Sequence, residues 1–241
     1  MPTPRHLSVQ DIPRWLQTAG RTWRQVPGFS LLYAAPLAVL ALFMFLLAWG
    51  LQAWPMIYAL ASGFLLVGGV ASAGLILQAM AIERHAAQGV GQIARRLLAE
   101  PRLLVLFGLS LFIWLIWITD AGILYGLYFS QQRLTEMPTF GLDSPLQAFL
   151  LFSGLMGAVP ALIMFAVATF AVPLLLESRC SLPQAIVLSV RTVFGNPLTL
   201  AAWGALVTLL VLASLLVLPL FFLVFPLLGY ASFACYRQAF P

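Results

Sequence analysis

Long apolar stretches without any charged residue dominate this sequence. The longest runs from Thr192 to Tyr236, which is 45 residues. As a single helix it would be about 68 Å long, roughly twice the hydrocarbon thickness of a bilayer. The run must therefore turn back on itself, and the best place for the turn lies between Ser214 and Pro219. It predicts two membrane spans near the lower length limit.

Four further apolar stretches reach the roughly 20 residues that a membrane-crossing helix needs. Charged residues make up 8% of the chain, against about 25% in soluble domains, so the composition excludes an ordinary soluble protein. The sequence predicts an all-α integral membrane protein with six transmembrane helices, as one membrane domain over residues 1–241. The expected spans are about 29–50, 55–80, 103–130, 146–176, 197–215 and 219–237.

The basic residues predict how these spans are oriented. All twelve are arginine, and with six spans only Arg133 falls on one side of the membrane. Cytoplasmic loops retain positive charge, so we expect both termini in the cytoplasm. The other side receives Arg5, Arg14, Arg21, Arg24, Arg84, Arg95, Arg96, Arg102, Arg179, Arg191 and Arg237.

A proline stands at the entrance of three spans, at Pro27, Pro101 and Pro197. Proline cannot continue a helix that has already formed, but it fits the first turn of a new one. Each proline therefore predicts a break between two helices.

The segments before these prolines are amphipathic, with arginine on the polar side. Helices of this kind lie in the membrane interface. We expect three hairpins, each preceded by a cytoplasmic interfacial helix; ordinary amphipathic loops are the alternative. In the third segment Ser181 and Gln184 form a capping box, and Gly195 is expected to close the helix in the left-handed conformation. The three helices are expected at residues 8–26, 88–99 and 181–194.

Asp120 is the candidate functional residue inside a span. A carboxylate in hydrocarbon is costly, so it is by default a functional hypothesis, here a proton or cation site between helices. The alternative is that Asp120 lies in the outer third of its span, where it meets water. We favour this alternative because no second intramembrane charge is present as a partner.

Two further patterns concern packing. Glu177 and Arg179 follow span four, and Glu83 and Arg84 follow span two. They either pair or mark the water boundary, and the boundary is the favoured interpretation. In span two, small residues permit close approach of a neighbouring helix. These are Gly63, Gly68, Gly69 and Gly74.

Catalytic and cofactor-binding motifs are missing from the sequence. There is no nucleotide-binding loop, no zinc-protease motif and no serine–histidine arrangement in a span. His6 and His85 both lie outside the spans, which excludes a bis-histidine membrane haem. Cys180 and Cys235 have no metal or redox spacing. The arginines are scattered rather than gathered on one face, so we expect neither a cofactor, a metal nor nucleic acid.

Several segments resemble a known family. They are "LLLESRCSLPQAIVLSVRTVFGNPLTLAAW", "FPLLGYASFACYR", "WLQTAGRTWRQVPGFSLLYA" and "ALASGFLLVGG". They are similar to a proteobacterial family of six-span inner-membrane proteins of unknown function. The likeness covers nearly the whole chain, with the middle weakest. It implies a bacterial inner-membrane location, and its motifs are structural rather than catalytic.

The resemblance also includes a departure. The last helix in that family often carries histidines where this chain has Tyr230 and Ala234. The difference weakens any metal or haem role here.

These observations lead to two functional hypotheses. The first is a non-enzymatic accessory or scaffold subunit that contacts the lipid bilayer and packs against another membrane protein or against itself. The alternative is a small transporter or permease with Asp120 as its ion or proton site.

Overall fold

The computed structural model describes residues 5–129 and 145–241, and within these residues the chain is helical with no strand. The prediction of an all-α membrane protein is confirmed, because six helical segments of the described chain are long and apolar enough to cross a bilayer. They are α2 (Pro27–Gly50), α3 (Met56–Ala71) continued by α4 (Ala73–Glu83), α6 (Pro101–Phe129), α7 (Pro145–Leu176), α9 (Pro197–Leu216) and α10 (Phe221–Ala239).

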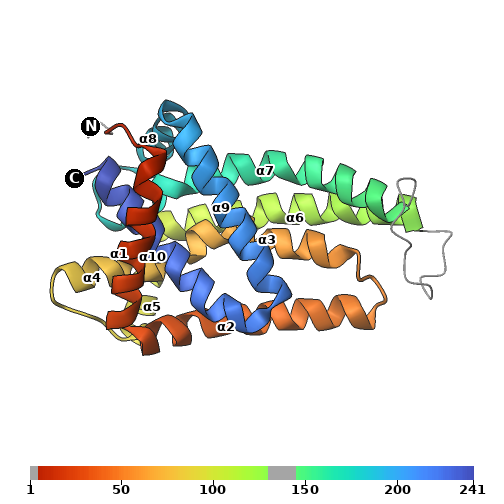
Figure 1. Cartoon of the computed structure of the whole chain (residues 1–241), viewed down its shortest axis with the longest axis horizontal. Coiled ribbons are helices and arrows are strands. Elements are labelled where there is room, and N and C mark those ends of the chain that lie inside the picture. The colour runs from red at the N-terminus through yellow and green to blue at the C-terminus, as the bar shows by residue number, and fades with distance from the viewer. Residues whose placement is uncertain (1–4, 130–144) are drawn as a thin grey trace.

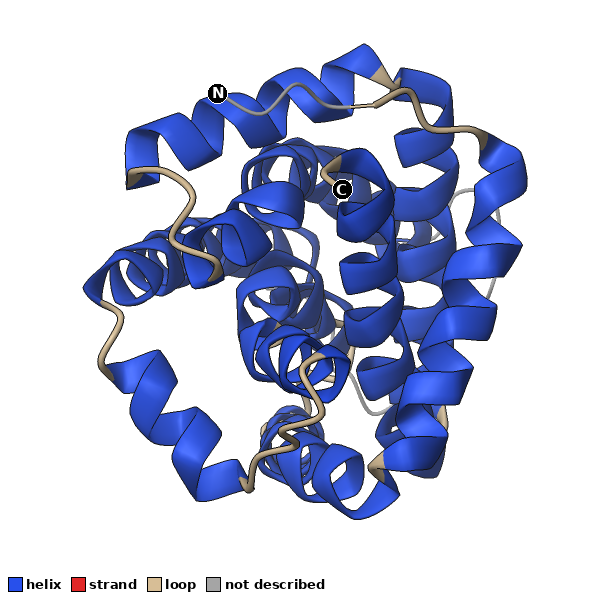
Figure 2. Cartoon of the chain, turned by 90° about the vertical axis from the view of Figure 1, so that its left-hand side faces the viewer, coloured by secondary structure: helices blue, strands red, loops and turns tan. Residues whose placement is uncertain are grey.

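Three shorter helices lie at the end of the bundle that holds both termini (Figure 1). They are α1 (Ile12–Gln25), α5 (Val90–Leu98) and α8 (Leu182–Gly195). We call this end the terminal face. Figure 2 looks onto it and shows the three helices lying around the ends of the long ones. Each precedes a pair of long helices, which is the order that the sequence predicts. We call these three the surface helices, and each surface helix with the pair of long helices that follows it a unit.

The three short helical segments begin in the same way, and the first of them starts with a 3-10 helix, Val9–Asp11, that leads into α1. In each, a side chain three residues into the segment accepts a hydrogen bond from the backbone N–H of its first residue, which satisfies a donor that the helix leaves free. The pairs are Ser8 with Asp11, Gly89 with Gln92, and Ser181 with Gln184. The long helices α2, α6 and α9 then begin at Pro27, Pro101 and Pro197.

The end of α8 differs from the prediction. Gly195 is the last helical residue and has no positive φ, so the expected left-handed conformation is wrong. The break falls instead on Asn196, with φ −132° and ψ 54°, because a following proline disfavours helical geometry. Val26, before Pro27, has nearly the same angles, φ −137° and ψ 55°. The first and third units therefore have the same backbone conformation between the surface helix and the long helix that follows it.

Each surface helix packs against a long helix of a different unit, so the three units contact one another at the terminal face. α8 packs chiefly against α7 and α5 against α4, so each lies on the last long helix of the preceding unit. α1 has no preceding unit and packs against α10, the last helix of the chain. Trp15 of α1 meets Trp203 edge-on at 5.7 Å and donates a hydrogen bond to Gln238 at 2.7 Å.

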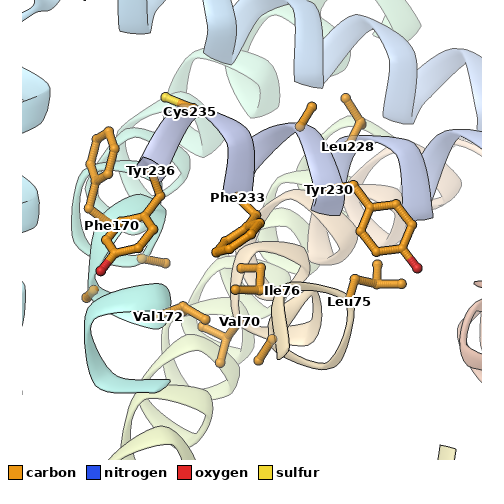
Figure 3. Packing of buried hydrophobic residues seen from close by; sticks show 14 of the residues in the cluster. Val70, Leu75, Ile76, Phe170, Val172, Leu228, Tyr230, Phe233, Cys235 and Tyr236 are labelled. Carbon is orange, nitrogen blue, oxygen red and sulfur yellow. The ribbon is translucent and has the colours of Figure 1, made fainter. Parts of the chain in front are cut away.

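The core is densest at the terminal face. Every residue from Ala73 to Ala81 is buried. Figure 3 shows Tyr230 and Phe233 of α10 against Leu75 and Ile76 of α4. This end therefore unites all three units in one apolar core.

The third hairpin, α9 with α10, stops short of the far end of the bundle. Its turn includes a short 3-10 helix, Leu218–Leu220. Leu218 lines a groove with Met44, and Phe221 packs on Phe64 at 5.5 Å. Met44 lies six residues before Gly50, the last residue of α2, so the turn ends about 9 Å before α2 does. The shorter reach of this hairpin is visible in Figure 1.

Candidate functional site

Asp120 lies in α6 close to the far end of the first hairpin. One turn before it, Trp117 donates a hydrogen bond to Ser62 at 2.5 Å. One turn after it, Leu124 packs in a cluster with Trp54, which belongs to the α2–α3 connection. Within the described residues, the half-buried Asp120 has neither an ion pair nor a hydrogen bond. The functional assignment of Asp120 therefore stays a hypothesis.

Charged side chains meet instead at the terminal face, around Glu177. Its carboxylate forms ion pairs with Arg179 at 2.6 Å and with Arg237 at 2.7 Å, and it accepts a hydrogen bond from the Tyr236 hydroxyl at 2.5 Å. Arg237 also binds Glu83 at 2.7 Å. We call these five residues the terminal ion cluster.

The terminal ion cluster resolves the alternative that the sequence left open. Glu177 and Arg179 pair rather than merely mark a boundary, and Glu83 joins them through Arg237. Sequence reasoning missed Arg237, because it lies 154 residues from Glu83 in the chain and no local pattern links them. Arg84, which was expected beside them, has no ion pair among the described residues.

The contacts of the terminal ion cluster stabilise the fold rather than form a reactive site. Only 7% of the Glu177 side chain is exposed, and a buried carboxylate requires paired charge and hydrogen bonds. Two arginines supply the charge and a tyrosine the hydrogen bond, so each of these contacts of the carboxylate is with the protein itself. The guanidinium of Arg237 also lies over the Phe233 ring at 4.9 Å. The cluster ties the ends of α4, α7 and α10 together.

The residues at the two family histidine positions have different environments. The Tyr230 hydroxyl shares a hydrogen bond of 2.8 Å with Ser30, which links α10 to the first turn of α2. Ala234 lines the cavity described next. In the part of the chain that the structure describes, no three His, Cys, Asp or Glu side chains gather as metal ligands would.

A cavity of about 460 Å³ lies at the terminal face between α1, α4 and α10. Three arginines line it together with uncharged polar side chains and an aromatic wall. Its lining comprises Arg14, Trp15, Thr18, Arg21, Thr22, Gln25, Ala79, Ile82, Glu83, Tyr230, Phe233, Ala234, Arg237 and Gln238. A second cavity, of about 120 Å³, lies among the spans beside Trp114, and its walls are almost entirely apolar.

Comparison with known families assigns the protein to one of them. Residues 56–177 match the model of a family described as a predicted integral membrane protein (DUF2189). The chain belongs to this family. DUF2189 has no known function, so membership supports an integral membrane protein without a defined activity. Neither the curated proteins nor the solved structures contain a match.

The matched segment runs from the start of α3 to the residue after α7. It covers the middle of the chain, where the sequence resemblance is weakest. It includes Asp120, Glu83 and Glu177, but not Arg237. The DUF2189 segment therefore supplies both carboxylates of the terminal ion cluster, while α10 supplies the arginine that joins them.

Proposed function

We propose that this DUF2189 protein is a non-enzymatic accessory subunit that packs against another integral membrane protein. The observation that carries the proposal is the short third hairpin. Val217, at its turn, is 57% exposed, and the turn lies beside apolar residues about one to two helical turns before the end of α2. In a bilayer that covers the apolar length of α2, this turn lies within the hydrocarbon.

A helix end in hydrocarbon needs groups that can bind its free backbone carbonyls. The last carbonyls of a helix lack partners within the helix, and Pro219 has no N–H to offer. Acyl chains cannot supply hydrogen bonds, so irregular backbone at this depth is tolerated where protein or water covers it. The adjoining groove, about 190 Å³, is lined by apolar side chains of α2 and α3 with Leu215 and Leu218. A transmembrane helix that carries a polar side chain would fill the groove and bind these carbonyls.

The proposal includes an orientation. The terminal face carries exposed arginines on α1 and α5, among them Arg21, Arg24 and Arg95. Because positive charge is retained on the cytoplasmic side, we place this face and both termini in the cytoplasm of a bacterial inner membrane.

Two observations favour binding over catalysis or transport. The buried carboxylate Glu177 is held by two arginines and a tyrosine. Asp120 has no ion pair within the described residues, so no charged partner for a proton or cation relay lies beside it there. Transport through Asp120 remains the alternative.

Photo-crosslinking in cells tests this proposal. A photoreactive amino acid at Val217 is expected to give one discrete adduct with a different membrane protein, whose detergent-stable complex contains the chain. The same residue at Leu155, on α7 and 69% exposed, is the control and should give none. Adducts with lipid alone, with a second copy alone, or equally from both positions would contradict the proposal. So would an ion flux in the purified protein that Asp120→Asn abolishes.

A further inference from the structure

We infer that the cavity between α1, α4 and α10 binds a phosphate group, supplied by the headgroup of an anionic phospholipid. Its volume of about 460 Å³ lies in the range of small-molecule sites, about 300–1,000 Å³. The inference does not depend on a partner subunit, because every lining residue belongs to this chain.

The charges around the cavity leave positive charge available. Arg237 is engaged by Glu83 and Glu177, and Glu83, which also lines the cavity, is thereby neutralised. Arg21 has no ion pair among the described residues. Arg14 contacts Asp11 only at 3.7 Å, with 81% of its side chain exposed. An anion in the cavity therefore meets two guanidinium groups that are free to bind it.

Two of the three arginines and several uncharged polar groups of the cavity lie on α1. Arg14, Thr18, Arg21 and Gln25 follow one another at intervals of three or four residues, so they lie along one side of α1. Guanidinium, hydroxyl and amide groups all donate hydrogen bonds to phosphate oxygens.

The cavity also has apolar lining. Ile82 of α4 and Phe233 of α10 line it beside the polar Glu83, Arg237 and Gln238 of the same two helices, and α1 adds the ring of Trp15. Tyr230, which also lines the cavity, is bonded to Ser30 in the first turn of α2, where that helix enters the bilayer. The cavity thus combines basic and apolar lining near the point where α2 enters the bilayer, which is the depth of lipid headgroups. Basic pockets between membrane helices on the cytoplasmic side bind anionic headgroups in this way.

Native mass spectrometry of the full chain in mild detergent tests the inference, with phosphatidylglycerol as the probe. Arg21→Gln is expected to weaken the first bound phosphatidylglycerol by about tenfold, because one charge-assisted contact is lost. The matched control is Arg24→Gln on the same helix. Arg24 is exposed and does not line the cavity, so its replacement removes the same charge and should change the affinity less than about twofold.

Two further arms identify the source of the phosphate. Phosphatidylcholine should bind more weakly than phosphatidylglycerol, and Arg21→Gln should reduce this difference. Inorganic phosphate should not displace bound phosphatidylglycerol; displacement would assign a soluble phosphate ligand and overturn the lipid assignment. Equal losses in Arg21→Gln and Arg24→Gln would reduce the effect to surface charge and overturn the site itself.

Discussion

Replacing Glu177 with glutamine is expected to lower the free energy of unfolding by about 3 kcal/mol. The substitution keeps the shape of the side chain but removes the charge that Arg179 and Arg237 share. Removing one partner of a buried ion pair leaves the other charge uncompensated, which typically costs about 3–5 kcal/mol. The arginines here are partly exposed, which places the effect at the lower end of this range. Unfolding in a mild detergent, followed by circular dichroism, measures it.

Glu83→Gln is the matched control for this prediction. Glu83 binds the same Arg237, but 47% of its side chain is exposed, so water screens the pair. Loss of this carboxylate should cost less than about 1 kcal/mol. If Glu177→Gln has no effect, the terminal ion cluster does not stabilise the packing of α7 and α10. Equal losses from both substitutions would contradict the claim that the burial of Glu177 sets the size of the effect.

Gly74→Ala is expected to destabilise the protein by about 2–3 kcal/mol. A Cβ atom at Gly74 would overlap the ring of Tyr33. The Tyr33 hydroxyl donates to the Ala71 carbonyl at 2.8 Å and accepts from the Gly74 N–H at 3.2 Å. Moving the ring breaks both bonds and disturbs the packing of α2 against the α3–α4 joint. The same unfolding measurement detects the change.

Gly68→Ala provides the comparison within the same span. No atom lies within 4 Å of a Cβ built at Gly68. Alanine also favours a helix over glycine by up to about 1 kcal/mol, so stability should be unchanged or higher. A loss at Gly68 as large as the loss at Gly74 would show that a factor other than the Tyr33 contact governs both positions.

The features that follow from local sequence could be predicted. Apolar length indicates the number of long helices, and proline geometry indicates where α2, α6 and α9 begin. The prediction that the glycines of span two permit close approach of other helices is correct for some of them. A Cβ at Gly63 would lie 2.5 Å from Trp114 Nε1, and one at Gly69 would lie 3.4 Å from Ala168, whereas Gly68 faces open space.

Features that arise from distant contacts could not be predicted. In the sequence, Arg237 is one of eleven arginines expected on the same side of the membrane. Only the fold brings it to Glu177 and Glu83. The short reach of the third hairpin also depends on tertiary contacts. Span length specifies that α9 and α10 can cross a bilayer, but the Ser30–Tyr230 bond and the Phe64–Phe221 contact determine how far their turn extends.

The central claim is that the turn of the third hairpin lies inside the hydrocarbon. Spin labels on Val217→Cys and Gln52→Cys, each in a chain with Cys180→Ser and Cys235→Ala, measure this depth in nanodiscs without any partner. Gln52 lies in the α2–α3 connection at the far end. The account predicts that the Val217 label is relaxed more by oxygen than by a water-soluble nickel chelate, and the Gln52 label the reverse. Equal access of the nickel chelate to both labels would contradict it.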